Sequence, residues 1–218
     1  MDSRSLLSRN TLMRFREVAV SNTVHRFHIE LEGIDPPVWR CIRVPSSYTF
    51  WDLHVAIQDA IGWLDYHLHL FQVRNPETGE FEQIGIPDDD PYLDELPCLA
   101  GWEVPIARYF VKEGDAASYE YDFGDDWRHT VTLEGIDTIR KGERRLACLG
   151  GERRCPPEDC GGIHGYAELL EVIADVTHFE HEAMLQWLGG AYDPEGFSAS
   201  DVKFDDPKVR WRNAFSND

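Results

Sequence analysis

Alternation of hydrophobic and polar residues dominates the first part of the chain. Residues 24–31 place His25, Phe27, Ile29 and Leu31 on one side, which predicts a half-buried strand. A second apolar run at 38–44 follows a glycine and two prolines. We therefore expect a hairpin-like connection between the two strands.

The pattern then changes to the period of a helix. Apolar residues at 53, 56, 57, 60 and 61 lie on one helical face, Ser47 or Thr49 can cap the start, and Gly62 can end it. Further strands are expected at about 67–73 and 80–85. The order strand, strand, helix, strand favours a β-grasp-like sheet in the N-terminal half.

Residues 119–131 predict a β-hairpin. With a three-residue loop at 124–126, Tyr121 would oppose His129 and Asp122 would oppose Arg128. Tyr119, Tyr121 and Phe123 would then share one face of the hairpin with Trp127, His129 and Val131. The preceding segments predict a surface loop at 84–101 and a short helix at 106–111.

The last third of the chain is predicted to be helical, at 166–174, 180–188 and 208–215. The fold class expected is therefore α+β: a β-grasp-like sheet with one packed helix, a β-hairpin and a C-terminal helical region. The expected domain organisation is a tail at 1–22, a domain at 23–190 and an extension at 191–218.

Charge and cysteine content limit the function classes. Forty Asp and Glu against 21 Lys and Arg give a net charge of −19, which disfavours binding to nucleic acid or to an anionic membrane. No signal peptide or membrane-spanning run is expected. The five cysteines show no disulfide framework, so we expect reduced thiols in a cytoplasmic protein.

Four segments, GIDPPVWRCIRVP (33–45), LHVAIQDAIGWLDYHLHLF (53–71), YEYDFGDDWRHTV (119–131) and CPPEDCGGIHGYAELL (155–170), resemble the plasmid pRiA4b ORF-3-like family. The resemblance implies an α+β fold and an association with mobile genetic elements, where such proteins occur as passengers. Some relatives in this family carry the label resolvase, which implies DNA binding. Residues 155–202 contain ten acids and no Lys or Arg. Because a recognition helix of that charge would be repelled by phosphates, we reject the label.

Three histidines are candidate metal ligands. His67 and His69 alternate on the predicted strand and would point to one face about 7 Å apart. His129 or His54 could complete the set for zinc or another divalent metal. The alternative is that these are core or edge histidines bonded to the backbone.

A second metal hypothesis uses the thiols of Cys155 and Cys160, with Cys148 and His164 as the nearest additions. A rigid loop without metal, shaped by Glu158 and Asp159, is the preferred interpretation. No cofactor is required by any motif. The acids 88–90 could in principle take Mg²⁺ or Ca²⁺, but the pattern favours a solvated turn.

Candidate binding residues come from the hairpin and from a basic loop. The hairpin supplies Asp122, Asp125, Asp126, Trp127 and Arg128, and the loop at 140–154 contains Arg144 and Arg145 among six basic residues. Asp122 opposite Arg128 is predicted to be a structural pair. The basic loop is the one segment where an anion could dock, although it could equally fold onto the acidic surface.

Three function hypotheses follow from these observations. The first is a non-catalytic module that binds an unknown protein partner or ligand. The second is a metal-dependent hydrolase that uses His67, His69 and His129. The third is accessory nucleic-acid binding through residues 140–154, with nucleic acid the less favoured partner and no membrane association.

Overall fold

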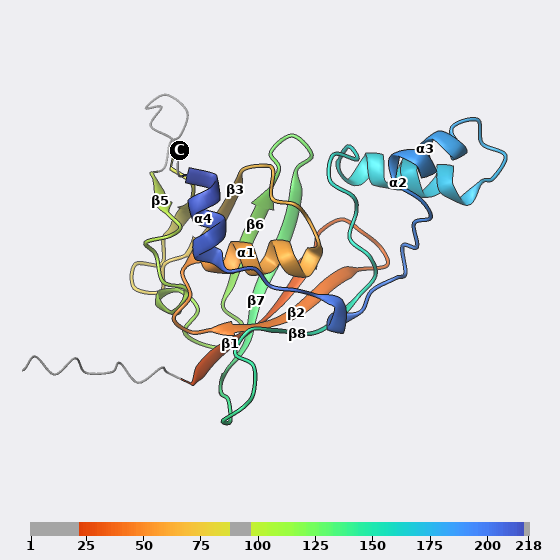
Figure 1. Cartoon of the computed structure of the whole chain (residues 1–218). Helices are drawn as coiled ribbons and strands as arrows, with labels where there is room; N and C mark the ends of the chain where they lie inside the picture. Colours follow the sequence, from red (N-terminus) through yellow and green to blue (C-terminus); the bar gives the residue numbers. More distant parts are fainter. Residues whose placement is uncertain (1–21, 88–96, 216–218) are drawn as a thin grey trace, which may run out of the picture.

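The computed structural model describes residues 22–87 and 97–215 and confirms an α+β fold (Figure 1). Almost all of the tail expected at 1–22, and the acids 88–90, lie outside the described residues. The elements are β1 (Thr23–Leu31), β2 (Val38–Pro45), α1 (Phe50–Ile61), β3 (His69–Arg74), β4 (Phe81–Gly85), β5 (Cys98–Ala100), η1 (Ile106–Arg108), β6 (Ala116–Tyr121), β7 (Trp127–Thr138), β8 (Ala147–Glu152), α2 (Gly162–Ala174), α3 (His181–Trp187), η2 (Ala199–Asp201) and α4 (Pro207–Phe215).

The strands form one mixed sheet in the order β5-β4-β3-β6-β7-β1-β2-β8. Helix α1 lies across one face of this sheet, α4 lies beside α1, and α2 and α3 extend beyond one side of the sheet (Figure 1). The strand, strand, helix, strand order of the N-terminal half is present, and the β6–β7 hairpin lies between β1 and β3. No helix in the described ranges is long and apolar enough to span a bilayer.

Strands β1 and β2 form the antiparallel hairpin that the alternation predicts. The side chains of Phe27, Ile29 and Leu31 are buried, as expected. Val24 is buried as well as its neighbour His25, so the start of β1 is covered on both faces. The register shift between Arg26 and Phe27 leaves Glu134 as the extra residue of β7, and β1 itself keeps its alternation.

Helix α1 begins and ends at residues that the sequence identifies. The Thr49 hydroxyl accepts from the Asp52 amide while the Asp52 carboxylate accepts from the Thr49 amide, which completes a capping box. Gly62 ends the helix with φ 93°, a left-handed conformation that glycine adopts without strain. The predicted apolar face is buried against the sheet.

Replacing the cap tests this assignment. We expect Thr49→Ala to lower the free energy of unfolding by about 1 kcal/mol, since one amide of the first turn loses its acceptor. Ser47→Ala is the matched control, because Ser47 is the alternative cap suggested by the sequence and is not the N-cap. Urea denaturation of the two variants measures the difference, and equal losses would contradict the assignment.

The β6–β7 hairpin forms with a register different from the one predicted. Tyr121 opposes Trp127, Tyr119 opposes His129, and Arg128 opposes Glu120 rather than Asp122. The loop is therefore five residues long, 122–126. Because the shift is an even number of residues, the predicted faces survive, with Tyr119, Tyr121, Trp127, His129 and Val131 buried. Phe123 lies in the loop and is exposed instead.

Three other predictions are wrong in detail. Part of the predicted loop at 84–101 forms β5, which pairs in parallel with β4. Residues 147–152 of the predicted basic loop form the edge strand β8, which pairs with β2. The strand expected from 67 begins at His69, so His67 belongs to the loop before it.

Candidate functional site: a carboxylate-rich corner beside a groove

Three loops that are distant in sequence meet at one corner of the molecule. They are the segment after α1 (62–67), the hairpin loop (122–126) and the loop before α2 (155–162). The Glu158 carboxylate accepts from the Leu64 amide and from the Tyr121 hydroxyl, each at 2.6 Å. The Asp125 carboxylate accepts from the Gly161 amide at 3.1 Å. These bonds tie the three loops together.

At this corner His67, Asp122 and Asp159 form a cluster. His67 Nε2 lies 3.0 Å from Asp159 Oδ1 and 3.5 Å from Asp122 Oδ2. One ligand-type atom from each of the three residues lies within 4.8 Å of the others. Among the residues that the structure describes, this is the one group of three or more His, Cys, Asp or Glu side chains that comes this close.

The backbone conformations of Asp122 and Asp159 place their carboxylates in the cluster. Both residues have left-handed φ values, 57° and 60°, which Asp tolerates better than most side chains. The Asp122 side chain also accepts from the Gly124 amide at 3.0 Å, which fixes the start of the hairpin loop. The carboxylate is therefore held in place before any ligand arrives.

Tyr121 positions the loop that contains His67. Its hydroxyl accepts from the backbone amides of Tyr66 and His67, at 3.0 and 3.3 Å, while it donates to Glu158. Burial, together with the neighbouring Glu158 carboxylate, raises the pKa of Tyr121, so the hydroxyl keeps the proton that it donates. The sequence gives no local signal for this contact.

His69 and His129 do not join His67, so the predicted three-histidine site is wrong. His69 is buried and stacks on His54 with ring centroids 3.5 Å apart. Burial holds the pKa of His69 well below its usual value and lowers the pKa of His129 to about 4. Both are core histidines, which is the alternative that the sequence left open.

His54 is also unavailable as a ligand because both ring nitrogens are bonded. Nε2 contacts the Asp65 carboxylate and Nδ1 contacts the Tyr119 hydroxyl, each at 2.8 Å. A carboxylate can only accept, so Nε2 donates to Asp65 and Nδ1 accepts from Tyr119. Gln58 donates to the same hydroxyl. This network buries polar groups beneath α1 without leaving a metal site.

The cysteine hypothesis for zinc is not supported by the geometry. Cys155 is buried and its sulfur accepts from the Arg40 guanidinium at 3.1 Å. Neither thiol belongs to a group of three or more ligand-type side chains within 4.8 Å among the residues that the structure describes. Cys148 lies on β8, and His164 is exposed on α2.

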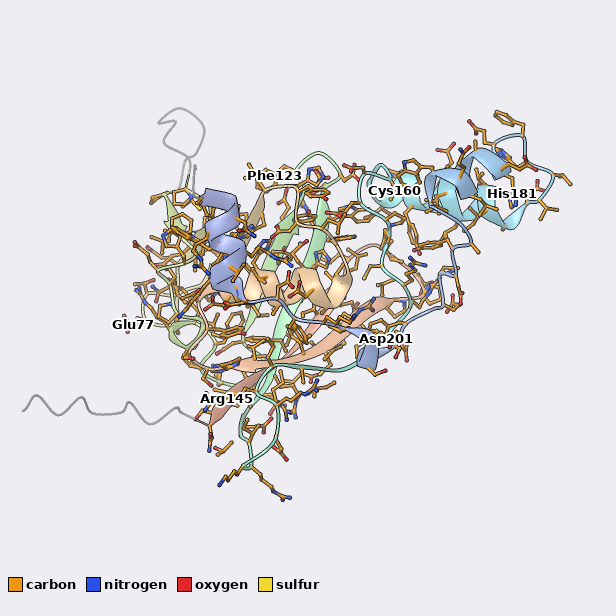
Figure 2. The ribbon with its side chains drawn as sticks, in the orientation of Figure 1. Glu77, Phe123, Arg145, Cys160, His181 and Asp201 are labelled. Carbon is orange, nitrogen blue, oxygen red and sulfur yellow. The ribbon has the colours of Figure 1, made fainter. Side chains whose placement is uncertain are left out.

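The other candidate binding residues are dispersed. Trp127 is fully buried, and Arg128 pairs with Asp126 at 2.6 Å on the surface. Figure 2 shows Arg145 at the end of the molecule remote from Cys160. Because β8 spans roughly 20 Å, the basic residues near Arg144 are separated from those at the other end of the strand. The segment 140–154 therefore does not form one basic patch.

A groove of about 570 Å³ adjoins the carboxylate corner, and the sequence did not predict it. Its lining comes from the segment after α1, from the loop before α2 and from the residues around the end of α3. Its apolar lining includes Trp63, Leu64, Tyr66, Pro156, Trp187 and Tyr192. Glu158 and Asp159 lie on the same groove, so it touches the cluster described above.

Comparisons with known proteins place the chain in a family. The profile of the "Plasmid pRiA4b ORF-3-like protein" family matches residues 23–201. "Uncharacterized protein y4hQ" of Sinorhizobium fredii is 32% identical over 201 residues, which are 87% of this chain and 94% of that protein. The crystal structure of "Protein of Unknown Function MM3350" from Methanosarcina mazei Go1 is 41% identical, with a TM-score of 0.76, and covers 84% of this chain and 98% of that one. On this evidence the chain belongs to the plasmid pRiA4b ORF-3-like family.

Proposed function

We propose that this protein is a non-catalytic interaction module whose groove binds a basic, amphipathic segment of a partner protein. The observation that carries the proposal is the exposure of large apolar side chains in the lining of the groove. In the segment after α1, Leu64 is 64% exposed and Tyr66 72%, and on α3 Trp187 is 51% exposed. Exposed apolar and aromatic side chains around a concavity are typical of binding sites for protein segments.

The charge around the groove selects the partner. Glu158 and Asp159 are the acids of the lining, and the segment 155–202 that contains them has ten acids and no Lys or Arg. Arg154 is the basic residue of the lining, and its guanidinium stacks on the Tyr192 ring at 4.8 Å. A segment that combines apolar side chains with Lys or Arg would bury its apolar face in the groove and meet carboxylates at the rim.

The five free cysteines favour a reducing compartment, so we place this interaction in the cytoplasm. Cys155 is buried and the other four cysteines are partly buried, which is consistent with thiols that serve packing.

Binding of a designed peptide tests the proposal. The full-length protein is titrated with an amphipathic peptide carrying arginines on one face and leucines on the other, while tryptophan fluorescence is followed. We expect Leu64→Ser to weaken binding about tenfold or more, because a buried leucine side chain contributes about 1.5–3 kcal/mol. Leu149→Ser is the matched control, since Leu149 is also exposed but lies on β8, outside the groove lining.

Three results would overturn the proposal. The first is equal weakening by the two serine variants, and the second is no binding of the peptide at about 1 mM. The third is a concentration-dependent dimer in sedimentation that Leu64→Ser converts to a monomer, because a second copy of the chain would then be the occupant. Equal binding of a peptide with glutamates in place of arginines would contradict the charge argument.

A further inference from the structure

We infer that His67, Asp122 and Asp159 bind one divalent transition-metal ion, such as Zn²⁺ or Mn²⁺. The site differs from the predicted histidine and cysteine sites, since it takes two ligands from loops whose carboxylates the sequence did not group with His67. It shares Asp159 with the groove lining, but the apolar residues on which the docking proposal rests contribute no ligand, so the two proposals can be tested separately.

The separations between ligand atoms fit a shared ion. When ligand atoms lie about 2.1 Å from one metal, their mutual distances are about 3.0 Å at a right angle and about 3.4 Å at a tetrahedral angle. The two distances from His67 Nε2 are 3.0 Å to Asp159 and 3.5 Å to Asp122. The third separation, between the two carboxylate oxygens, is at most 4.8 Å, so small adjustments of the loops would place the three atoms around a common centre.

The geometry of His67 helps to distinguish a metal site from a hydrogen-bonded ion pair. A ring N–H that donates to a carboxylate points at its oxygen, whereas ligands of one ion point at the ion and past one another. His67 Nε2 is buried and has no hydrogen-bond partner among the described residues, although Asp159 Oδ1 is only 3.0 Å away. The ring nitrogen therefore lies close to both carboxylates without the alignment of a hydrogen bond to either.

The electrostatic surroundings favour a cation. Besides Asp122 and Asp159, the corner contains Asp125 and Glu158, whose carboxylates are bonded to amides and to the Tyr121 hydroxyl. The nearest arginine of the hairpin, Arg128, is paired with Asp126. Asp122 is 8% exposed, so its charge is poorly screened by water and gains most from a bound ion.

The ligand set indicates the class of metal. One imidazole with two carboxylates suits Zn²⁺, Mn²⁺ or Fe²⁺ better than Ca²⁺ or Mg²⁺, which prefer oxygen ligands alone. The Asp159 side chain is 64% exposed, which leaves solvent access to the ion. Three protein ligands with an open position would let water complete the coordination.

Metal titration of the full-length protein, freed of metal by dialysis against chelator, tests the inference. We expect one equivalent of Zn²⁺ or Mn²⁺ in calorimetry, a higher melting temperature in their presence, and weaker binding of Ca²⁺. Asp159→Asn should weaken metal binding tenfold or more because it removes a charged ligand. The Asp159 side chain is exposed, so the substitution should leave the fold intact. Circular dichroism checks folding.

Asp126→Asn is the matched control, because Asp126 is an exposed acid in the same hairpin loop as Asp122 but lies outside the cluster. It should change the affinity less than twofold. The inference fails if neither Zn²⁺ nor Mn²⁺ binds at about 1 mM, or if the two asparagine variants bind equally well. Leu64→Ser should leave metal binding unchanged, so failure of the docking proposal and failure of the metal site can be told apart.

Discussion

Lowering the pH from 7 to 5 is expected to destabilise the protein by about 2 kcal/mol through His129 alone. Burial lowers the pKa of His129 from 6.5 to about 4, so the native state holds the neutral ring. In the unfolded chain the ring has its usual pKa and binds a proton more readily. The contribution of the neutral His129 ring to the free energy of unfolding is therefore fully present above about pH 6.5, and it is lost progressively as the pH falls toward 4.

His69 and His25 add to the effect in the same direction, because burial lowers the pKa of each. Urea denaturation at pH 7 and pH 5 measures the loss. His129→Gln should reduce the difference between the two pH values, whatever its effect at pH 7. His164→Gln, at an exposed position on α2, is the control and should leave that difference unchanged. An unaltered pH dependence in the His129 variant would contradict the assignment.

Removing the Arg210 guanidinium is expected to cost about 3 kcal/mol of stability and to release α4. Arg210 lies on α4 and contacts Asp59 on α1 at 2.6 Å and Asp65 at 3.5 Å. The side chains of these two acids are only 6% and 10% exposed. Burial already raises the pKa of Asp59, so Arg210→Ala would leave a carboxylate buried without its cation.

Urea denaturation and limited proteolysis near the C-terminus measure this effect. Arg212→Ala is the control, because Arg212 is exposed on the same helix. Adding Asp59→Asn to the Arg210 variant should recover part of the loss by removing the unpaired charge. Equal stability of the Arg210 and Arg212 variants would show that the ion pairs do not hold α4.

The elements with local signals were predictable from the sequence. Helix α1 follows from its apolar period together with the Thr49 cap and Gly62, and the β1–β2 hairpin follows from alternation and a glycine–proline break. In both cases the residues that decide the structure lie within a few positions of one another. The faces of the β6–β7 hairpin were predictable for the same reason.

The register of that hairpin was not predictable from turn length. Asp122 and Asp126 both adopt left-handed conformations, which makes room for a five-residue loop where a glycine suggested three. Strand β8 was not predicted because Gly150 and Gly151 interrupt its sequence, and glycines between polar residues favour the prediction of a loop. A side chain at Gly151 would approach the Trp39 carbonyl to 2.7 Å, so the glycine serves close approach of the edge strand.

The sequence identified the individual residues of the candidate site, but it did not show that they come together. His67, Asp122 and Asp159 were each singled out, yet the apparent alternation of His67 with His69 suggested a shared strand face. In the structure, the Tyr121 hydroxyl turns the His67 backbone away from β3. A contact between residues so far apart in sequence produces no periodic pattern along the chain. The sequence therefore could not show that Asp122 and Asp159 lie beside the His67 imidazole.

The central place of β6 and β7 in the sheet has a consequence for the newborn chain. The ribosome delivers β1 and β3 well before the hairpin that joins them, and Thr23 finds its partner only when Thr138 has emerged. Until then both strands present open backbone edges to other nascent polypeptides. Because pairing between distant strands slows folding, we expect the interval before Thr138 emerges to be the one in which the chain is most prone to aggregation.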